Sequence, residues 1–200
     1  MNPVHRQVIV GITGASGAIL GIRALELLRE AGCETHLIIS RAAERIIPAE
    51  TGWSLADVHS LANYCYEVED ISARIASGSF TTEGMLVVPC SIKTLSGIAN
   101  SYADDLIVRA ADVCLKEGRK LILVLRETPL HQGHIRLMKQ AAEAGAVLFP
   151  AVPAFYAGHP TVDEIVRDMA GRILLRLGID NPAYFRWEGM QSHEDGSEEA

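Results

Sequence analysis

The sequence predicts a three-layer α/β fold built on a doubly wound parallel sheet. Five short apolar segments, rich in Val, Ile and Leu, alternate along the chain with stretches of helical composition. Continuous apolar runs are typical of strands that helices cover on both faces. Strands that alternate with helices indicate βαβ units, which place the strands in one parallel sheet.

Local signals place each element in turn. The expected strands are residues 8–12, 35–40, 84–88, 121–125 and 147–149, with a candidate short strand at 66–68. Helices are expected at residues 18–30, in two pieces between 41 and 64, and at 91–100, 104–117, 134–144 and 161–177. Pro48 is expected to break the second helix, and Ser54 to cap its second piece. Thr161-x-x-Glu164 has the pattern of a capping box, and Gly178 the position of a helix C-terminal glycine.

Chain length and charge limit the possible classes of protein. We expect a single domain over residues 1–187 and an acidic tail of disordered composition over 188–200. The tail holds five acidic residues and no Lys or Arg, and the remaining 20 acidic and 18 basic residues nearly balance. No basic stripe predicts nucleic-acid binding. The lack of a long apolar run or a signal-like N-terminus predicts a cytoplasmic protein without a membrane span.

Cysteine and histidine usage predicts no disulfide and no metal site. The four cysteines are widely spaced and form no C-x-x-C motif, which is typical of reduced thiols in the cytoplasm. Cys90 follows an expected strand and is interpreted as a small buried residue. His131 and His134 form an H-x-x-H pattern without an evident third ligand.

The stretch from residue 8 to 21 is the most informative, because an apolar strand runs through small residues 14–17 into a helix. Unpaired N–H groups at a helix N-terminus, reached through small residues, make a site for phosphate. Polar residues also follow the other expected strands, namely Ser40-Arg41, residues 90–94, residues 126–128 and Tyr156. Ligands bind at these carboxyl ends in a doubly wound sheet. The hydroxyls and cations there predict a phosphorylated ligand.

A nicotinamide dinucleotide is one candidate ligand, since T-G-A-S-G opens many short-chain dehydrogenases. Ala18 stands where their pattern has a glycine, and no Tyr is followed four residues later by Lys. Both departures argue against a dehydrogenase, although Ser40-Arg41 would tolerate a 2′-phosphate.

Several segments together resemble the UbiX-like flavin prenyltransferases, formerly described as phenylacrylic or hydroxyarylic acid decarboxylases. The segments are GITGASGAILG, SRAAERIIPAET, PAFY and the long stretch from VVPCSIKT to RETPL, and the resemblance extends from about Val8 to Trp187. It implies a flavodoxin- or Rossmann-like fold and a metal-independent transfer of a dimethylallyl group from dimethylallyl monophosphate to N5 and C6 of reduced FMN. It also implies that a UbiD-type decarboxylase receives the prenylated FMN. The enzyme would be a large homo-oligomer, commonly a dodecamer, with sites at subunit interfaces.

The resemblance assigns roles to individual residues. FMN would be bound by Gly14, Ala15, Ser16, Ser40, Ser91, Ile92, Lys93, Thr94 and Arg126. The prenyl phosphate would be contacted by Arg109, Lys116, Glu127, Tyr156 and Arg172, with Trp187 closing the pocket. The catalytic residues would be Ser16 and Glu50, which move protons at the flavin, and Glu127 at the phosphate. Cations and a proton donor suit a leaving phosphate, and aromatic faces stabilise an allyl cation.

Two other functions stay open. One is an FMN-dependent cysteine decarboxylase of the related fold, which carries P-A-S-A-N-T where this chain has PCSIKT. The missing Asn and the presence of RETP count against it. The other is a non-catalytic subunit that binds FMN for an aromatic acid decarboxylase, which Glu50, Lys116 and Glu127 argue against. The sequence leaves open whether the donor is a monophosphate or a diphosphate.

Overall fold

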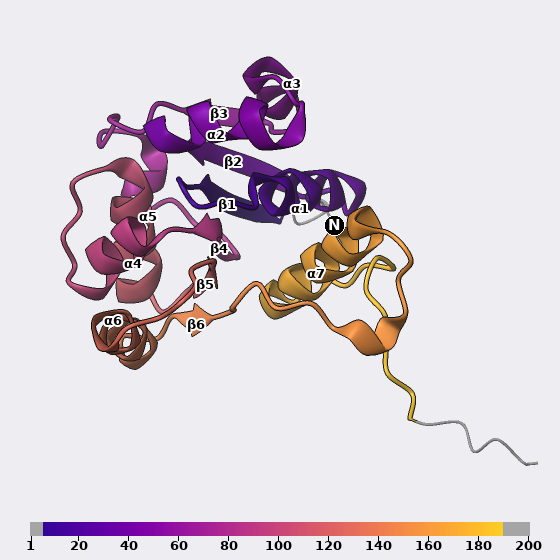
Figure 1. The fold of residues 1–200 in the computed structure, drawn as a ribbon. Coiled ribbons are helices and arrows are strands. Elements are labelled where there is room, and N and C mark those ends of the chain that lie inside the picture. Colours follow the sequence, from indigo (N-terminus) through magenta and orange to yellow (C-terminus); the bar gives the residue numbers. More distant parts are fainter. Residues whose placement is uncertain (1–5, 190–200) are drawn as a thin grey trace, which may run out of the picture.

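The computed structural model describes residues 6–189, which form one six-stranded parallel sheet between two layers of helices (Figure 1). The strands are β1 (Gln7–Ile12), β2 (Glu34–Ile39), β3 (Tyr64–Tyr66), β4 (Gly84–Cys90), β5 (Lys120–Leu125) and β6 (Val147–Leu148). Their spatial order is β3-β2-β1-β4-β5-β6, and every neighbouring pair is parallel. The predicted doubly wound fold is confirmed, with its switch point between β1 and β4.

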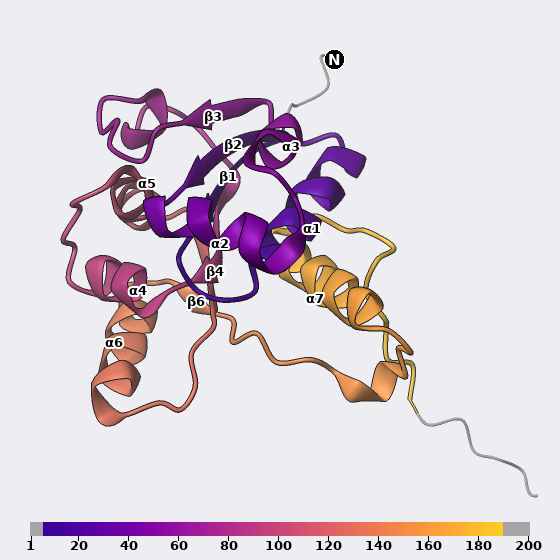
Figure 2. The same cartoon turned by 45° about the horizontal axis from the view of Figure 1, so that its top comes forward.

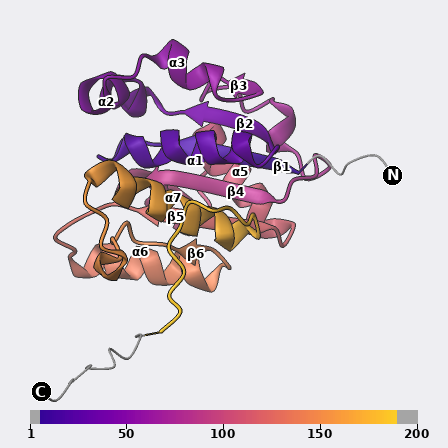
Figure 3. The same ribbon diagram turned by 90° about the vertical axis from the view of Figure 1, so that its right-hand side faces the viewer.

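Helices cover both faces of this sheet. They are α1 (Ala18–Glu30), α2 (Arg41–Thr51), α3 (Leu55–Ser60), α4 (Ile92–Ala99), α5 (Leu106–Lys116), α6 (Gln132–Glu143) and α7 (Val162–Leu177), with 3₁₀ turns η1 (Arg74–Ala76) and η2 (Phe155–Ala157). In Figure 3, α1 and α7 lie in front of the sheet and α5 lies behind it. Within residues 6–189, no helix has the length and apolar content needed to cross a lipid bilayer.

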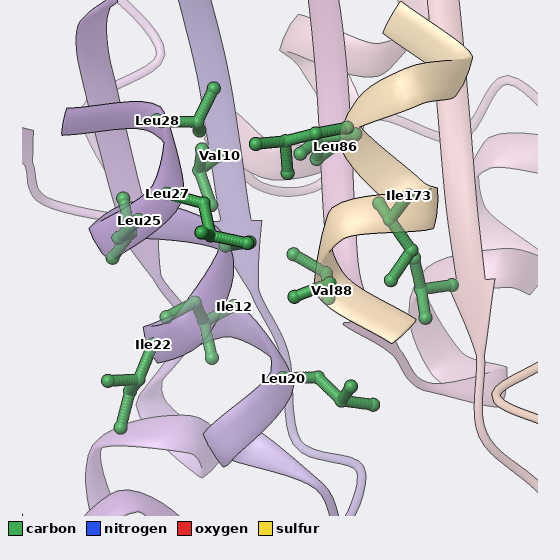
Figure 4. Packing of buried hydrophobic residues seen from close by; sticks show 14 of the residues in the cluster. Val10, Ile12, Leu20, Ile22, Leu25, Leu27, Leu28, Leu86, Val88 and Ile173 are labelled. Atoms are coloured by element: carbon green, nitrogen blue, oxygen red, sulfur yellow. The ribbon is translucent and has the colours of Figure 1, made fainter. Parts of the chain in front are cut away.

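The core consists of two apolar clusters, one on each face of the sheet. Successive side chains of a strand point to opposite faces. Val10 and Ile12 therefore pack with α1 and α7, whereas Ile9 packs with α5 on the other face. Figure 4 shows the first cluster, in which Val10 and Ile12 lie with Val88 of β4 and Ile173 of α7. Burial on both faces is the physical reason for the apolar runs in the sequence.

The helix signals are confirmed at three places and wrong at one. Ser54 and Thr161 both form capping boxes, and Gly178 ends α7 with a φ of 81°. Pro48, however, does not break α2, which continues to Thr51. The proline removes one backbone N–H near the end of an exposed helix, so its cost stays local.

Strand and helix boundaries differ slightly from the expectation. The short strand expected at residues 66–68 is β3, and it occupies residues 64–66. Ser91 and Asp105 are N-caps rather than helical residues, because each side chain accepts a hydrogen bond from the first turn of its helix. The predicted acidic tail lies almost entirely outside the described residues.

A buried histidine, His36, lies in β2 next to the edge strand β3. His36 of β2 has no exposed surface and stacks on Tyr64 with 4.9 Å between ring centroids, and its Nδ1 lies 3.0 Å from the Tyr66 hydroxyl oxygen. Burial and then the positive charge of Arg74 lower the pKa of His36 to about 4, although Glu34 acts in the opposite direction. The folded protein therefore keeps this imidazole neutral near pH 7.

We expect the protein to lose stability as the pH falls from 6.5 towards 4, because the unfolded chain then protonates His36 and the folded chain does not. A pKa lowered from 6.5 to about 4 corresponds to at most about 3 kcal/mol of unfolding free energy. Urea unfolding at pH 7 and at pH 5 should show a larger drop for the native protein than for His36→Phe, which keeps a ring in the stack but cannot titrate. Equal drops would contradict this role of His36.

Candidate functional site

A cleft of about 580 Å³ opens at the carboxyl ends of the strands, between the loop after β1 and the starts of α2 and α4. This volume is in the range of ligand sites in proteins. Its lining residues are Gly14, Ser40, Arg41, Ala42, Val68, Glu69, Ser91, Ile92, Lys93, Thr94, Asp104, Asp105 and Glu127. The structure therefore brings together the predicted residues Gly14, Ser40, Ser91, Ile92, Lys93, Thr94 and Glu127.

Another hollow, of about 700 Å³, lies at the opposite edge of the sheet, where β1, β4 and β5 begin. Its lining within residues 6–189 includes none of the predicted site residues. Ligands of doubly wound folds bind at the carboxyl ends of the strands, so we assign the site to the cleft at the switch point.

Two helix N-termini face the cleft. Ser40 caps α2 and Ser91 caps α4, each Oγ accepting a hydrogen bond, of 3.2 and 3.3 Å, from the first helical turn. Buried Thr13 fixes the second of these N-termini, because its hydroxyl donates to the carbonyl of Pro89 at 2.7 Å and accepts from the N–H of Ser91 at 2.8 Å. Free N–H groups and the partial positive charge of both helices make this end of the cleft attractive to an anion.

Thr13 is a site residue that sequence reasoning missed. It lies directly before Gly14 and is 1% exposed. A polar residue at the end of an otherwise apolar strand was the available signal, because a buried hydroxyl requires partners. Its partners, however, lie 76 and 78 residues away in the chain.

Gly14 lines the cleft, but its missing side chain also serves packing within the protein. A Cβ at this position would lie 2.5 Å from the Cβ of Ala42 in α2. The interpretation that small residues here let a ligand approach is therefore incomplete, since α2 occupies part of that space.

We expect Gly14→Ala to lower the free energy of unfolding by about 1–3 kcal/mol, because the two methyl groups clash unless α2 moves. The double variant Gly14→Ala/Ala42→Gly should recover part of this loss, since it removes the contact from the other side. Thermal unfolding of both variants measures the effect. A double variant less stable than Gly14→Ala would show that the clash is not the cause.

The N-terminus of α1, predicted to hold a phosphate, is occupied by a carboxylate of the chain itself. Glu50 Oε2, from the end of α2, accepts a hydrogen bond of 2.8 Å from the N–H of Gly17. Burial by itself raises the pKa of Glu50, but hydrogen bonds from Ser16, Gly17 and Ala18 and the charge of Arg126 hold that pKa below its usual value. Glu50 is therefore an ionised carboxylate that bonds to Ser16 and lies near Arg126.

Arg41 belongs to the cleft wall, but carboxylates already surround it. Its guanidinium donates to both oxygens of Glu69 at 2.8 and 2.7 Å, and to Glu44 and Glu67 at 2.8 and 3.1 Å. The cation expected to tolerate a 2′-phosphate is thus neutralised, so a second phosphate finds no unpaired charge there. This arrangement counts against the 2′-phosphate of NADP beside Arg41.

Lys93 and Glu127 border the other side of the cleft. The Nζ atom of Lys93 lies 3.2 and 3.1 Å from carboxylate oxygens of Asp104 and Asp105. Glu127, in the loop after β5, is exposed, and its Oε1 accepts a hydrogen bond of 3.0 Å from the N–H of Thr128. Glu127 therefore projects at the mouth of the cleft, where a ligand would cover it.

Tyr156, Arg172 and Trp187 form a separate cluster beside α7. The hydroxyl of Tyr156 lies 3.5 Å from Nη1 of Arg172, and its ring packs edge-on against Trp187 with 5.3 Å between centroids. Tyr156 lies in η2, at the end of an extended segment that leaves β6 and runs to the side of α7 (Figure 2). Within residues 6–189, the lining of the cleft includes none of these three residues.

Arg109 and Lys116 lie on α5, apart from the other predicted residues. Arg109 donates from Nε to the carbonyl of Ala76 at 3.2 Å, and Lys116 is paired with Glu117. Because α5 ends just before β5 begins, Lys116 lies towards the amino edge of the sheet. The length of a six-residue strand, about 20 Å, separates that edge from Glu127. A contact of Lys116 with the same ligand as Glu127 therefore requires a second copy of the chain.

Cys90 and the histidine pair have structural surroundings. Cys90 is fully buried at the end of β4, and burial raises the pKa of its thiol to about 12, so it is not a nucleophile near pH 7. His131 and His134 lie ring against ring, with 3.7 Å between centroids. Among residues 6–189, no three His, Cys, Asp or Glu side chains are grouped closely enough to hold a metal ion.

Comparison with known proteins agrees with this geometry. The chain matches the Flavoprotein family model over residues 2–174. It is 50% identical over 188 residues to the flavin prenyltransferase UbiX of Thauera aromatica, covering 94% of this chain and 97% of that protein. The structure is similar to that of AnUbiX (PadA1) in complex with FMN and dimethylallyl pyrophosphate, with a TM-score of 0.92 and 45% identity over 94% of this chain and 100% of that one. It is also similar to a dodecameric FMN-dependent UbiX-like decarboxylase from Escherichia coli O157:H7, with a TM-score of 0.89 and 48% identity over 92% of this chain and 100% of that one. The chain therefore belongs to the Flavoprotein family and, within it, to the UbiX flavin prenyltransferases.

Proposed function

We propose that this protein transfers a dimethylallyl group from a dimethylallyl phosphate to reduced FMN and releases phosphate. The observation that carries the proposal is a single cleft in which two serine-capped helix N-termini meet Glu127 of the RETPL segment. The two helix N-termini suit the phosphate of a mononucleotide, and the carboxyl group of Glu127 suits proton transfer at a leaving group. The family membership of the chain supports the same reaction.

FMN fits the residues of the cleft. Its single phosphate would lie at the N-termini of α2 and α4, bonded by Ser40, Ser91 and Thr94. Arg41 is already paired with carboxylates, which disfavours a second phosphate beside it. Ser16 and Arg126, which lie beside Glu50, would then border the flavin ring.

The proton chemistry follows from the charge of each group. Bound reduced FMN supplies the nucleophilic atoms N5 and C6. Glu50 is ionised, so it can accept the proton that C6 loses, and the Ser16 hydroxyl bonded to it holds its orientation. Glu127 would give a proton to the phosphate oxygen as the allylic C–O bond breaks, once bound ligand covers its carboxyl group. The rings of Tyr156 and Trp187, which lie outside the cleft of their own chain, would face the positive charge on the prenyl carbon from a neighbouring subunit.

A neighbouring subunit completes the site in this proposal. Within one chain, Arg109 and Lys116 lie apart from the cleft, while apolar side chains around η2 are open to solvent, with Phe155 78% and Val152 69% exposed. Exposed apolar surface of this kind marks an interaction site. We infer a homo-oligomer, and the dodecameric relative supports twelve subunits.

In the cell, a UbiD-type decarboxylase would receive the prenylated FMN that this protein makes. The location would be the cytoplasm, where thiols stay reduced. The four cysteines, all within the described residues, are free thiols, which is consistent with that compartment.

The test is anaerobic incubation of the purified protein with reduced FMN and either dimethylallyl monophosphate or the diphosphate, followed by mass analysis of the flavin. A mass gain of one C5 unit is expected, and comparison of the two donors identifies the substrate. The same mixture without protein is the control. Unchanged flavin on a folded, FMN-loaded protein would overturn the proposal and leave the non-catalytic FMN carrier.

A further inference from the structure

We propose that Asp168 is a positioning residue that holds the rings of Tyr156 and Trp187 in place at the prenyl site. This proposal rests on the proposed function, in which these two rings face the prenyl group of the donor. Asp168 lies in the middle of α7 and is 2% exposed. A carboxylate at such depth is costly unless it is well bonded. One hydrogen bond and one close contact of Asp168 lead to the two segments that carry Tyr156 and Trp187.

The first bond holds the C-terminal segment. Oδ1 of Asp168 accepts a hydrogen bond of 2.5 Å from the backbone N–H of Phe185, two residues before Trp187. Asn181 fixes the same segment, since its Nδ2 donates to the carbonyl of Gly171 at 3.0 Å. Gly171 is in such close contact that a Cβ there would lie 2.9 Å from the backbone N of Tyr184. The segment therefore lies directly on the face of α7 that carries Asp168.

The second contact holds the segment after η2. Nε2 of His159 lies 3.6 Å from the same Oδ1 of Asp168. His159 is three residues beyond Tyr156, and its Nε2 is buried without a hydrogen-bond partner among the described residues. The two segments meet at their aromatic rings, where Tyr156 packs against Phe185 at 5.9 Å and Trp187 at 5.3 Å between centroids.

Arg172 links this arrangement to the phosphate. It lies four residues after Asp168, so both side chains project from the same face of α7. Its Nη1 lies 3.5 Å from the Tyr156 hydroxyl. Asp168 thus sets the position of both aromatic rings relative to the cation that would bind the donor phosphate, while it lies outside the cleft assigned to FMN.

The test compares Asp168→Ala, Asp168→Asn and the control Asp163→Asn, an exposed carboxylate of the same helix that pairs with Arg23 of α1. Asp168→Ala should raise KM for the dimethylallyl donor about tenfold, the scale of one lost charge-assisted hydrogen bond, with FMN affinity unchanged. Asp168→Asn should restore most of the loss, because its amide oxygen still accepts from Phe185. In a Trp53→Phe background, Trp187 emission should shift to longer wavelength in Asp168→Ala only.

Three results would overturn the proposal. One is an Asp168→Ala protein with native KM and native Trp187 emission. Another is an equal loss of donor and FMN affinity, which indicates a general structural defect. If Asp168→Ala does not fold, His159→Ala tests the second contact, and native KM and native emission in that variant would contradict the proposal. Failure of the native protein to prenylate FMN would instead reject the proposed function, and the emission data would still decide whether Asp168 positions Trp187.

Discussion

Replacing Glu127 with glutamine is expected to lower the rate of prenyl transfer by about 10²–10⁴-fold while FMN stays bound, the range for loss of a general acid. Glutamine has the same shape, so the lining of the cleft is preserved. It cannot, however, give a proton to the oxygen of the leaving phosphate. Single-turnover rates and FMN titration of the same variant measure the two properties separately.

The matched control for this experiment is Glu143→Gln, which changes an exposed carboxylate of α6 that pairs with Lys139. It should leave both transfer and FMN binding unchanged. Native turnover in Glu127→Gln would remove Glu127 from the mechanism. Loss of FMN binding in that variant would instead assign Glu127 to the flavin.

Replacing Lys116 with methionine is expected to slow transfer by about 10²–10³-fold, because one positive charge on the developing phosphate is lost. FMN affinity should not change, since Lys116 lies on α5 outside the lining of the cleft. Lys139→Met is the matched control, because that lysine pairs with Glu143 on the surface of α6.

Mixing the two inactive variants tests whether Lys116 acts on a neighbouring subunit. In oligomers assembled from equal amounts of Lys116→Met and Glu127→Gln chains, about a quarter of the sites would combine a native Glu127 with a native Lys116 from another copy. Transfer activity should recover to that fraction, whereas each variant alone stays inactive. Hybrid oligomers without recovered activity would show that the two residues do not serve one site across subunits.

The fold was predictable because its signals are local or periodic. The capping boxes at Ser54 and Thr161 join residues three apart, and Gly178 ends α7 through its own φ angle. The misplaced strand shows the limit of such signals. Residues 64–66 form β3 in a setting where Tyr64 stacks on His36 of β2, and no local pattern contains that neighbour.

The candidate site was predictable only in part. Strand ends identified Ser40, Ser91 and Glu127, because all carboxyl ends of a parallel sheet meet at one edge. Residue types and the family resemblance identified the cations and aromatic rings. They could not show that Arg109, Lys116, Tyr156, Arg172 and Trp187 lie outside the cleft that the described residues of a single chain form.

The sequence by itself determined the doubly wound sheet, the polar strand ends and the family of this protein. The tertiary structure alone decided that Glu50 accepts a hydrogen bond from Gly17 at the start of α1, that Thr13 joins β1 to the start of α4, and that Asp168 contacts two segments packed on α7. The physical reason is distance along the chain. Each of these hydrogen bonds joins residues from 17 to 78 positions apart, and only packing of the whole sheet and its helices brings such groups within hydrogen-bond range.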